Sequence, residues 1–199
     1  TGGGVAVLDF DRDGLPDLYF ANGCPLPEDS AGLNKPHPGY HDRLFRNRGD
    51  GRFDDVTFSA RLGDDRFSQG VAVGDHNNDG YPDLFIANLG GNRFYENNGD
   101  GTFNEITAET GTSGNEWSMS GLLTDLNGDS LPDLYVVNYL QKDPVFQRDC
   151  KRDGKPLTCA PTLFPAEQDR LYLNLGDGTY RDVTEDAGIV VPDGKGLGI

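Results

Sequence analysis

The sequence predicts an all-β fold, a fragment of a β-propeller with three four-stranded blades and the start of a fourth. A nine-residue segment recurs, as DFDRDGLPD at residues 9–17, DHNNDGYPD at residues 75–83 and DLNGDSLPD at residues 125–133. Short apolar runs flank each copy, and an Asp-Gly turn between two further runs follows it. Four short antiparallel strands in a repeat of about 40–50 residues are typical of a propeller blade. A β-sandwich or an open solenoid is the alternative architecture.

Each repeat begins with two strands on either side of the nine-residue segment. The first strand is a glycine-led apolar run, at residues 4–7, 70–73 and 121–123. We expect it to line the crowded central channel and to be buried on both faces. The second strand is expected at residues 18–22, 84–88 and 134–138.

The third and fourth strands form a hairpin that begins at residues 42, 92 and 169. Asp-Gly is a strong signal for a two-residue hairpin turn, and it occurs at Asp50-Gly51, Asp100-Gly101 and Asp177-Gly178. Alternating apolar residues in these strands indicate half-buried outer strands.

Two insertions interrupt the repeat at the same point, between the second and third strands. They span residues 23–41 and 139–168, and we expect both to emerge on one face. The chain then reads as a single partial propeller over residues 1–199, with blades at about 1–63, 64–113 and 114–190 and the start of the next blade at 191–199. Three blades do not normally close a ring, so we expect further blades or another copy to complete it.

The nine-residue segment has the chemistry of a calcium loop. Oxygen-bearing side chains recur at positions 1, 3, 5 and 9, and the proline at position 8 is expected to aim the position 7 carbonyl at the ion. Calcium accepts 6–8 oxygen ligands in flexible geometry, whereas magnesium demands near-octahedral order and zinc prefers His and Cys. We therefore predict up to three Ca²⁺ sites, formed by Asp9, Asp11, Asp13, Leu15 and Asp17; by Asp75, Asn77, Asp79, Tyr81 and Asp83; and by Asp125, Asn127, Asp129, Leu131 and Asp133.

Two other readings of these loops are weaker. An EF-hand needs a bidentate Glu at position 12 and flanking helices, but position 12 is Phe20, Ile86 and Val136 and the flanks resemble strands. A simple acidic turn is common in β-proteins, but threefold recurrence of one ligand spacing argues against it.

Position 6 separates the third loop from the other two. It is Gly14 and Gly80 in the first two loops, where glycine permits the positive φ of a sharp turn, and Ser130 in the third. By carboxylate count we expect the first loop to bind calcium tightest, and we expect the third, with Ser130, to bind it weakest. Even-numbered positions are expected to point away from the metal, and His76 at position 2 is expected to be exposed to solvent.

The composition indicates which binding partners and which cellular location to expect. The net charge of −16 disfavours nucleic acid as a partner, and no apolar run is long enough to span a membrane. Cys150 and Cys159 lie in one Pro-rich insertion and are expected to form a disulfide, which leaves Cys24 either free and buried or paired outside the chain. Calcium loops with a disulfide indicate an extracellular or periplasmic protein.

These motifs resemble those of a known family. The Gly-x-Ala-x-x-Asp strand, the D-x-[DN]-x-D-G-x-x-D-L loop and the N-x-G-D-G-x-[FY] hairpin are similar to FG-GAP/VCBS repeats, the calcium blades of integrin α-subunits and of many secreted bacterial proteins. The Cys-containing insertion resembles the cartilage acidic protein/ASPIC-UnbV type. The resemblance implies a propeller with calcium between the first and second strands of a blade, and it implies no catalytic activity.

The function expected from these features is that of a secreted, non-catalytic binding, adhesion or scaffold module. Its partner would be a protein or polysaccharide ligand on the insertion face. The alternative is a calcium-dependent, polysaccharide-active lyase or hydrolase on a propeller scaffold. The sequence contains no G-x-S-x-G motif, no P-loop and no Cys/His pair that indicates a nucleophile.

Overall fold

The computed structural model describes residues 3–26 and 33–199. The first two residues of the expected first blade and the middle of the first insertion therefore lie outside the described residues.

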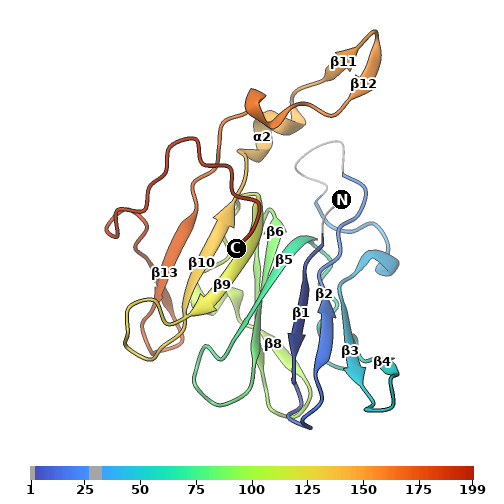
Figure 1. Ribbon diagram of the computed structural model, residues 1–199, viewed down its shortest axis with the longest axis vertical. Coiled ribbons are helices and arrows are strands. Elements are labelled where there is room, and N and C mark those ends of the chain that lie inside the picture. The colour runs from blue at the N-terminus through green and yellow to red at the C-terminus, as the bar shows by residue number, and fades with distance from the viewer. Residues whose placement is uncertain (1–2, 27–32) are drawn as a thin grey trace.

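Three four-stranded antiparallel sheets lie side by side, and in each the strands follow chain order (Figure 1). The first contains β1 (Val5–Leu8), β2 (Asp17–Phe20), β3 (Arg43–Asn47) and β4 (Phe53–Asp55). The second contains β5 (Phe67–Gly74), β6 (Asp83–Leu89), β7 (Arg93–Asn97) and β8 (Phe103–Glu105). The third contains β9 (Ser118–Thr124), β10 (Asp133–Asn138), β13 (Arg170–Asn174) and β14 (Tyr180–Asp182). This is the predicted all-β fold, a propeller fragment.

Helices are few and short in the described residues. They are η1 (Pro38–Tyr40), α1 (Thr107–Thr110), α2 (Lys142–Phe146) and η2 (Pro161–Leu163). The second insertion also forms a small hairpin of β11 (Cys150–Arg152) and β12 (Lys155–Leu157). The predicted disulfide between Cys150 and Cys159 closes this hairpin, and Cys24 is a free, buried thiol. None of these helices combines the length and the apolar character that crossing a membrane requires.

The strand register places each nine-residue segment in a tight connection between the first two strands of its sheet. The last residue of the first strand pairs with position 9 of the loop, as Leu8 with Asp17, Gly74 with Asp83 and Thr124 with Asp133. Positions 1 and 9 therefore begin and end a closed turn, which brings their carboxylates near each other.

The hydrophobic core lies between the sheets. One cluster joins the first sheet to the second through residues such as Leu8, Tyr19, Leu44, Ile86 and Phe103. A second cluster joins the second sheet to the third through the corresponding residues, including Phe85, Phe94, Leu134, Val136 and Tyr180. Because successive side chains in a strand point to opposite faces, the middle sheet packs on both neighbours.

The loops and the insertions occupy opposite edges of the three sheets. Figure 1 shows the turns that join the first and second strands at the lower edge, and the second insertion with α2 and the β11–β12 hairpin above the upper edge. A third hydrophobic cluster joins both insertions, because it contains Cys24 and Leu33 from the first and is packed by Phe146 from the second. Trp117, Phe67 and Leu89 complete it. The two insertions therefore emerge on one side, as the repeat predicts.

Candidate metal centres

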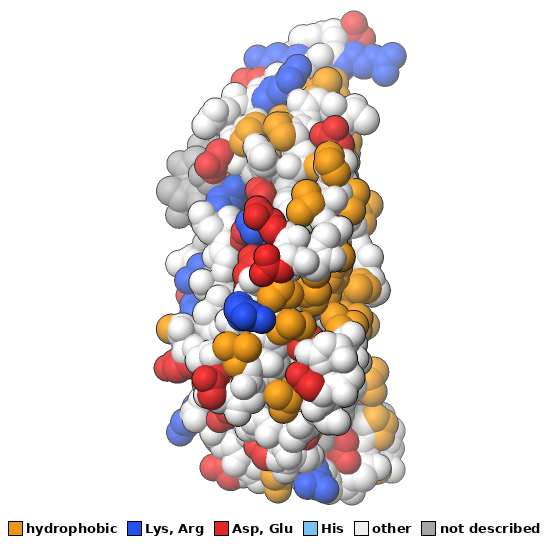
Figure 2. All heavy atoms as spheres, turned by 90° about the vertical axis from the view of Figure 1, so that its left-hand side faces the viewer, with side chains coloured by type: hydrophobic (Ala, Val, Ile, Leu, Met, Phe, Trp, Pro, Cys, Tyr) orange, Lys and Arg blue, Asp and Glu red, His pale blue; other side chains and the backbone are white. Residues whose placement is uncertain are grey.

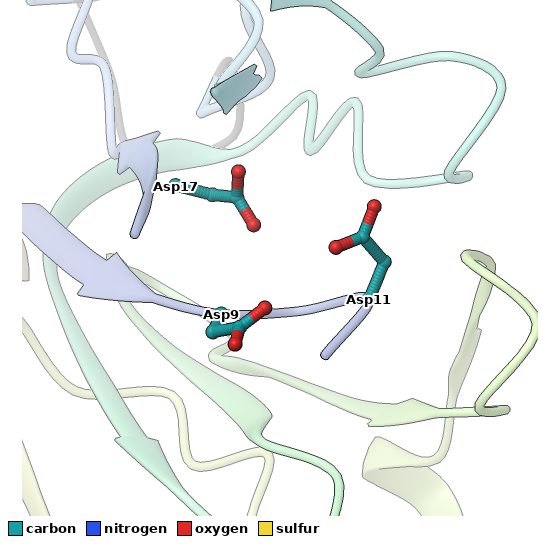
Figure 3. A group of neighbouring side chains, drawn as sticks. All are labelled: Asp9, Asp11 and Asp17. Atoms are coloured by element: carbon teal, nitrogen blue, oxygen red, sulfur yellow. The ribbon is translucent and has the colours of Figure 1, made fainter. Parts of the chain in front are cut away.

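The first loop brings three carboxylates together. Oxygen atoms of Asp9, Asp11 and Asp17 lie within 4.8 Å of one another, and Figure 3 shows the three side chains around a shared space. Asp9 follows β1 and Asp17 begins β2, so the paired strand ends determine this approach. In the second and third loops position 3 is Asn77 and Asn127, so an amide oxygen replaces one carboxylate.

The aspartate at position 1 organises the backbone of every loop. Its two carboxylate oxygens accept the N–H groups of positions 5 and 6: Asp13 and Gly14 at 3.0 and 3.0 Å on Asp9, Asp79 and Gly80 at 3.0 and 2.7 Å on Asp75, and Asp129 and Ser130 at 3.2 and 2.9 Å on Asp125. Hydrogen bonds to the ionised form favour it. The N–H groups of Ser130 and Gly128 accordingly lower the pKa of Asp125.

Position 6 adopts the left-handed conformation in all three loops. Its φ is 85° at Gly14, 89° at Gly80 and 72° at Ser130, so the third loop holds a serine where the first two have a glycine. A side chain at positive φ costs roughly 1 kcal/mol or more. Position 4 is also left-handed, with φ of 55° at Arg12 and 57° at Asn78. No residue type that favours positive φ recurs at this position in all three loops, so this second strained position was not predicted.

The aspartate at position 9 ties the loop to the third strand. It is fully buried in each loop, as Asp17, Asp83 and Asp133. One oxygen accepts the N–H of position 2, and the other accepts the N–H of an asparagine in the third strand, from Asn97 to Asp83 at 2.8 Å for example. Burial raises the pKa of Asp83 to about 6, and these two N–H groups act in the opposite direction. A cation beside this carboxylate would favour its charged form.

Positions 5 and 7 complete the turn. The N–H of position 7 donates to the carboxylate of position 5, at 2.9 Å from Leu15 to Asp13 and at 2.8 Å from Tyr81 to Asp79 and from Leu131 to Asp129. These bonds hold position 7 in the loop. The assignment of the position 7 carbonyl as a metal ligand stays a prediction.

The donor set fits a hard cation. All the side chains offered by positions 1, 3, 5 and 9 present carboxylate or amide oxygens, and three of the first loop's carboxylates already surround one space. Calcium takes such ligands in variable number and geometry. Carboxylates at this separation also repel one another unless a positive charge lies near them.

The side chain at position 2 packs between neighbouring sheets in the first two loops. His76 was expected to be exposed, and that prediction is wrong: only 3% of its surface is accessible. Its ring packs 5.1 Å from that of Phe94 and 6.5 Å from that of Tyr180, between the second and third sheets. Phe10 occupies the same position in the first loop and is also 3% exposed. The apolar residues at this position in the other two loops, Phe10 and Leu126, were the available signal.

An asparagine in the third strand links neighbouring sheets through the same position. Nδ2 of Asn97 donates to the carbonyl oxygen of Phe10, and Nδ2 of Asn174 donates to that of His76, both at 2.8 Å. Each bond runs from one sheet to the loop of the preceding sheet. In the second and third repeats the asparagine of the N-x-G-D-G motif therefore joins its blade to the preceding one.

A cavity at the insertion edge is a second candidate site. Its volume is about 610 Å³, and its lining includes Trp117, Tyr139, Arg148, Asp149 and Phe164 together with both disulfide cysteines. Trp117 and Tyr139 meet edge to face, with ring centroids 5.5 Å apart. Apolar walls with a few polar groups are typical of ligand pockets.

Comparison with known families identifies the repeat. A family model described as FG-GAP-like repeat matches residues 9–86 and again residues 75–136. The two matches together cover more than half of the chain and include all three nine-residue segments. No curated protein matches the chain.

Solved structures give a weaker comparison. The chain is similar to a lectin from Agrocybe aegerita, described as specifically recognising non-reducing terminal N-acetylglucosamine, with 16% sequence identity and a TM-score of 0.38. The match covers 90% of this chain and 51% of the lectin chain, so the chain spans about half the lectin's length. At this level of similarity the lectin indicates neither the architecture nor the ligand of this chain.

Proposed function

The chain belongs to the FG-GAP-like repeat family, and from that premise we propose that it is a calcium-stabilised propeller segment acting as a secreted, non-catalytic binding, adhesion or scaffold module. The observation that carries this proposal is that the two opposite edges of the sheets carry different kinds of site. Carboxylate loops gather at one edge, while the insertions and their cavity gather at the other.

Calcium is proposed to bind at the loop edge, one ion in each nine-residue segment. Asp9, Asp11 and Asp17 would hold the ion of the first loop together with Asp13 and the carbonyl of Leu15, and the equivalent residues would serve in the other loops. A bound ion supplies the positive charge that offsets carboxylate repulsion. Because it would join the end of one strand to the start of the next, its role would be to stiffen the blade.

Ligand recognition is proposed at the insertion edge. Loops on a rigid scaffold commonly carry binding residues. Here the disulfide closes the small hairpin of the second insertion, and the shared hydrophobic cluster packs both insertions against the middle sheet. The cavity beside Trp117 and Tyr139 has the size of a small-ligand site. A protein loop or a polysaccharide would be its partner. The disulfide also supports the proposed extracellular or periplasmic location.

Ring closure is proposed through the two outer sheet faces, with the blade boundaries given above. The third sheet presents an apolar groove of about 360 Å³, lined by Leu126, Leu171, Leu173, Val183 and Ala187 among others. Figure 2 shows hydrophobic side chains gathered on this side of the molecule. The first sheet exposes Val5, Val7 and Phe53 on its opposite face. Since equivalent faces inside the molecule are covered by a neighbouring blade, we assign these two faces to further blades, in a longer chain or in a second copy.

Thermal unfolding tests the calcium proposal. Calcium at about 100 times its Kd should stabilise the native state by about 2.7 kcal/mol for each occupied site and raise the melting temperature accordingly. The variant Asp13→Ala should lose part of this increase. Asp54→Ala, which removes an exposed carboxylate outside the loops, should keep it. An unchanged melting temperature with calcium and with chelator, and no ion retained in native mass spectrometry, would exclude the proposal.

Screening against acidic and neutral polysaccharides, with and without calcium, tests the binding role. The proposal expects retention without turnover. Calcium-dependent cleavage that disappears when an insertion carboxylate such as Asp149 is replaced would show an enzyme instead.

A further inference from the structure

One position of the third strand differs sharply in charge among the three repeats. It immediately precedes the asparagine of the N-x-G-D-G motif, and it holds Arg46 in β3, Glu96 in β7 and Leu173 in β13. The backbone N–H of that asparagine donates to the position 9 aspartate in every repeat, at 2.7 Å for Asn47 and Asp17. The same contact therefore holds this position beside the nine-residue segment in all three repeats.

In the first repeat, Arg46 makes ion pairs with two predicted ligands. Its Nε lies 2.8 Å from Oδ2 of Asp11, and its Nη2 lies 3.3 Å from Oδ2 of Asp13. These carboxylates raise the pKa of Arg46. The guanidinium thus already neutralises part of the loop.

The first loop has a particular need for this charge. In the other loops position 3 is an asparagine whose Nδ2 donates to the position 5 aspartate, at 3.0 Å in the second and 2.9 Å in the third. Asp11 has no proton to donate in this way when ionised, so Asp11 and Asp13 would repel each other without a shared cation. Arg46 provides that cation from within the chain.

In the second repeat the same position adds a negative charge. Oε2 of Glu96 lies 3.0 Å from Nε2 of His76 and 3.4 Å from Nδ2 of Asn77, which is a predicted ligand. About a third of the Glu96 side chain is exposed, so it remains open to the loop surface. The second loop is therefore supplemented by a carboxylate that its nine-residue segment does not contain.

The formal charges reverse the order expected from the loops alone. Four carboxylates and Arg46 give the first loop −3, while three carboxylates and Glu96 give the second −4. We propose that this third-strand position tunes calcium affinity: Arg46 competes with calcium for Asp11 and Asp13, and Glu96 strengthens the second loop, so the second loop binds calcium more tightly than the first. This inference rests on the proposed calcium function.

Calorimetric titration of calcium into chains with one intact loop tests the proposal. Asp79→Ala with Asp129→Ala leaves the first loop intact, and Asp13→Ala with Asp129→Ala leaves the second intact. In the first background Arg46→Gln should lower the Kd about tenfold, because it removes a unit positive charge that pairs with two predicted ligands, Asp11 and Asp13. In the second background Glu96→Gln should raise the Kd by a similar factor.

Matched controls separate local contact from net charge. Arg48→Gln makes the same charge change two residues away, where Arg48 instead pairs with Asp54 at 3.4 Å. It should leave the Kd of the first loop within about twofold, since within the described residues Arg48 forms no ion pair with a predicted ligand and interactions between more distant exposed charges are largely screened. Glu109→Gln, an exposed residue of α1, serves in the same way for the second loop. Circular dichroism of each calcium-free variant shows that it is folded.

The outcomes separate this inference from the proposed function. If calcium binds but Arg46→Gln and Arg48→Gln behave alike, or if the first loop binds more tightly than the second, the tuning role is excluded while the calcium function stands. If neither single-loop chain nor the unmodified protein binds calcium, the proposed function is excluded and the tuning role with it.

Discussion

The middle sheet and the two outer sheets have closely similar sequences but different surroundings. The aromatic residue that begins the fourth strand is 1% exposed as Phe103 in the middle sheet and 8% exposed as Tyr180 in the third, but 42% exposed as Phe53 in the first. Loop position 2 shows the opposite trend along the chain, because Phe10 and His76 are buried and Leu126 is 47% exposed. Each blade therefore has one face for the preceding blade and one for the next.

This difference shows that burial here is a property of the neighbour rather than of the residue. In repeat proteins stability is approximately a sum of terms within each repeat and terms between adjacent repeats. Equivalent positions of the three sheets therefore form matched pairs, in which one residue contacts a neighbouring sheet and the other does not.

The largest expected effect comes from the fourth-strand aromatic residue. Phe103→Ala should reduce the free energy of unfolding by about 3–5 kcal/mol, since it removes a fully buried ring between two sheets. Phe53→Ala should cost less than about 1 kcal/mol, because that ring is already exposed. Urea unfolding of the two variants measures both values. Equal losses would show that the neighbouring sheet does not determine the contribution.

The next effect is a pH dependence at the covered junction of the first and second sheets. Lys35 Nζ contacts Asp42, the Asp64 carbonyl oxygen at 3.0 Å and Ser68 Oγ at 3.1 Å, and the side chains of this ion pair are fully buried. Burial raises the pKa of Asp42 to about 6 from 3.8, although Lys35 acts to lower it. The native state then holds this proton more tightly than the unfolded state does.

Stability should therefore fall as the pH rises through this range. The contribution of Asp42 is fully present below about pH 4 and is lost by about pH 6, with a magnitude on the order of 2–3 kcal/mol. Urea unfolding at several pH values from 4 to 7 should show this decline in the unmodified protein and a smaller decline in Asp42→Asn. An identical slope in the two proteins would contradict the raised pKa.

A smaller effect isolates the bond between blades. Asn97 and Asn47 both donate to a proline carbonyl oxygen of their own loop and accept the N–H of a glycine, but Asn97 also donates to Phe10 in the neighbouring sheet. Asn97→Ala should cost about 1–2 kcal/mol more than Asn47→Ala, because it leaves a buried carbonyl oxygen without its partner. Denaturant unfolding of both variants measures the difference. Equal losses of stability would show that the bond from Asn97 to Phe10 does not stabilise the contact between blades.

The smallest effect on stability is expected at the exposed apolar groove. Leu126→Ser should change the free energy of unfolding by less than about 0.5 kcal/mol, yet it should weaken self-association, since exposed apolar patches favour contact between molecules. Sedimentation velocity over a range of concentrations measures this association. Leu163→Ser, an exposed residue of the insertion edge, is the control that should leave it unchanged.

Much of the fold could be predicted because its signals are local. The spacing of Asp9, Asp11 and Asp17, the Asp-Gly turns and the period-2 strands all lie within a few residues of one another. Gly14 and Gly80 at positive φ, and the disulfide within one insertion, are of the same kind. The burial of His76 has only an indirect local signal, the apolar residues at the same position of the other loops, because the rings that cover it, Phe94 and Tyr180, come from strands that are distant in the sequence.

By itself the sequence determined the repeat, the strand pairs and the oxygen-rich loops, since each depends on residue type and spacing within one turn of chain. The tertiary structure alone decided which faces are covered, which asparagines join two sheets, and that Arg46 and Glu96 lie against the first and second loops with opposite charge. Arg46 is 35 positions beyond Asp11 and Glu96 is 19 beyond Asn77, and only strand pairing brings such residues together.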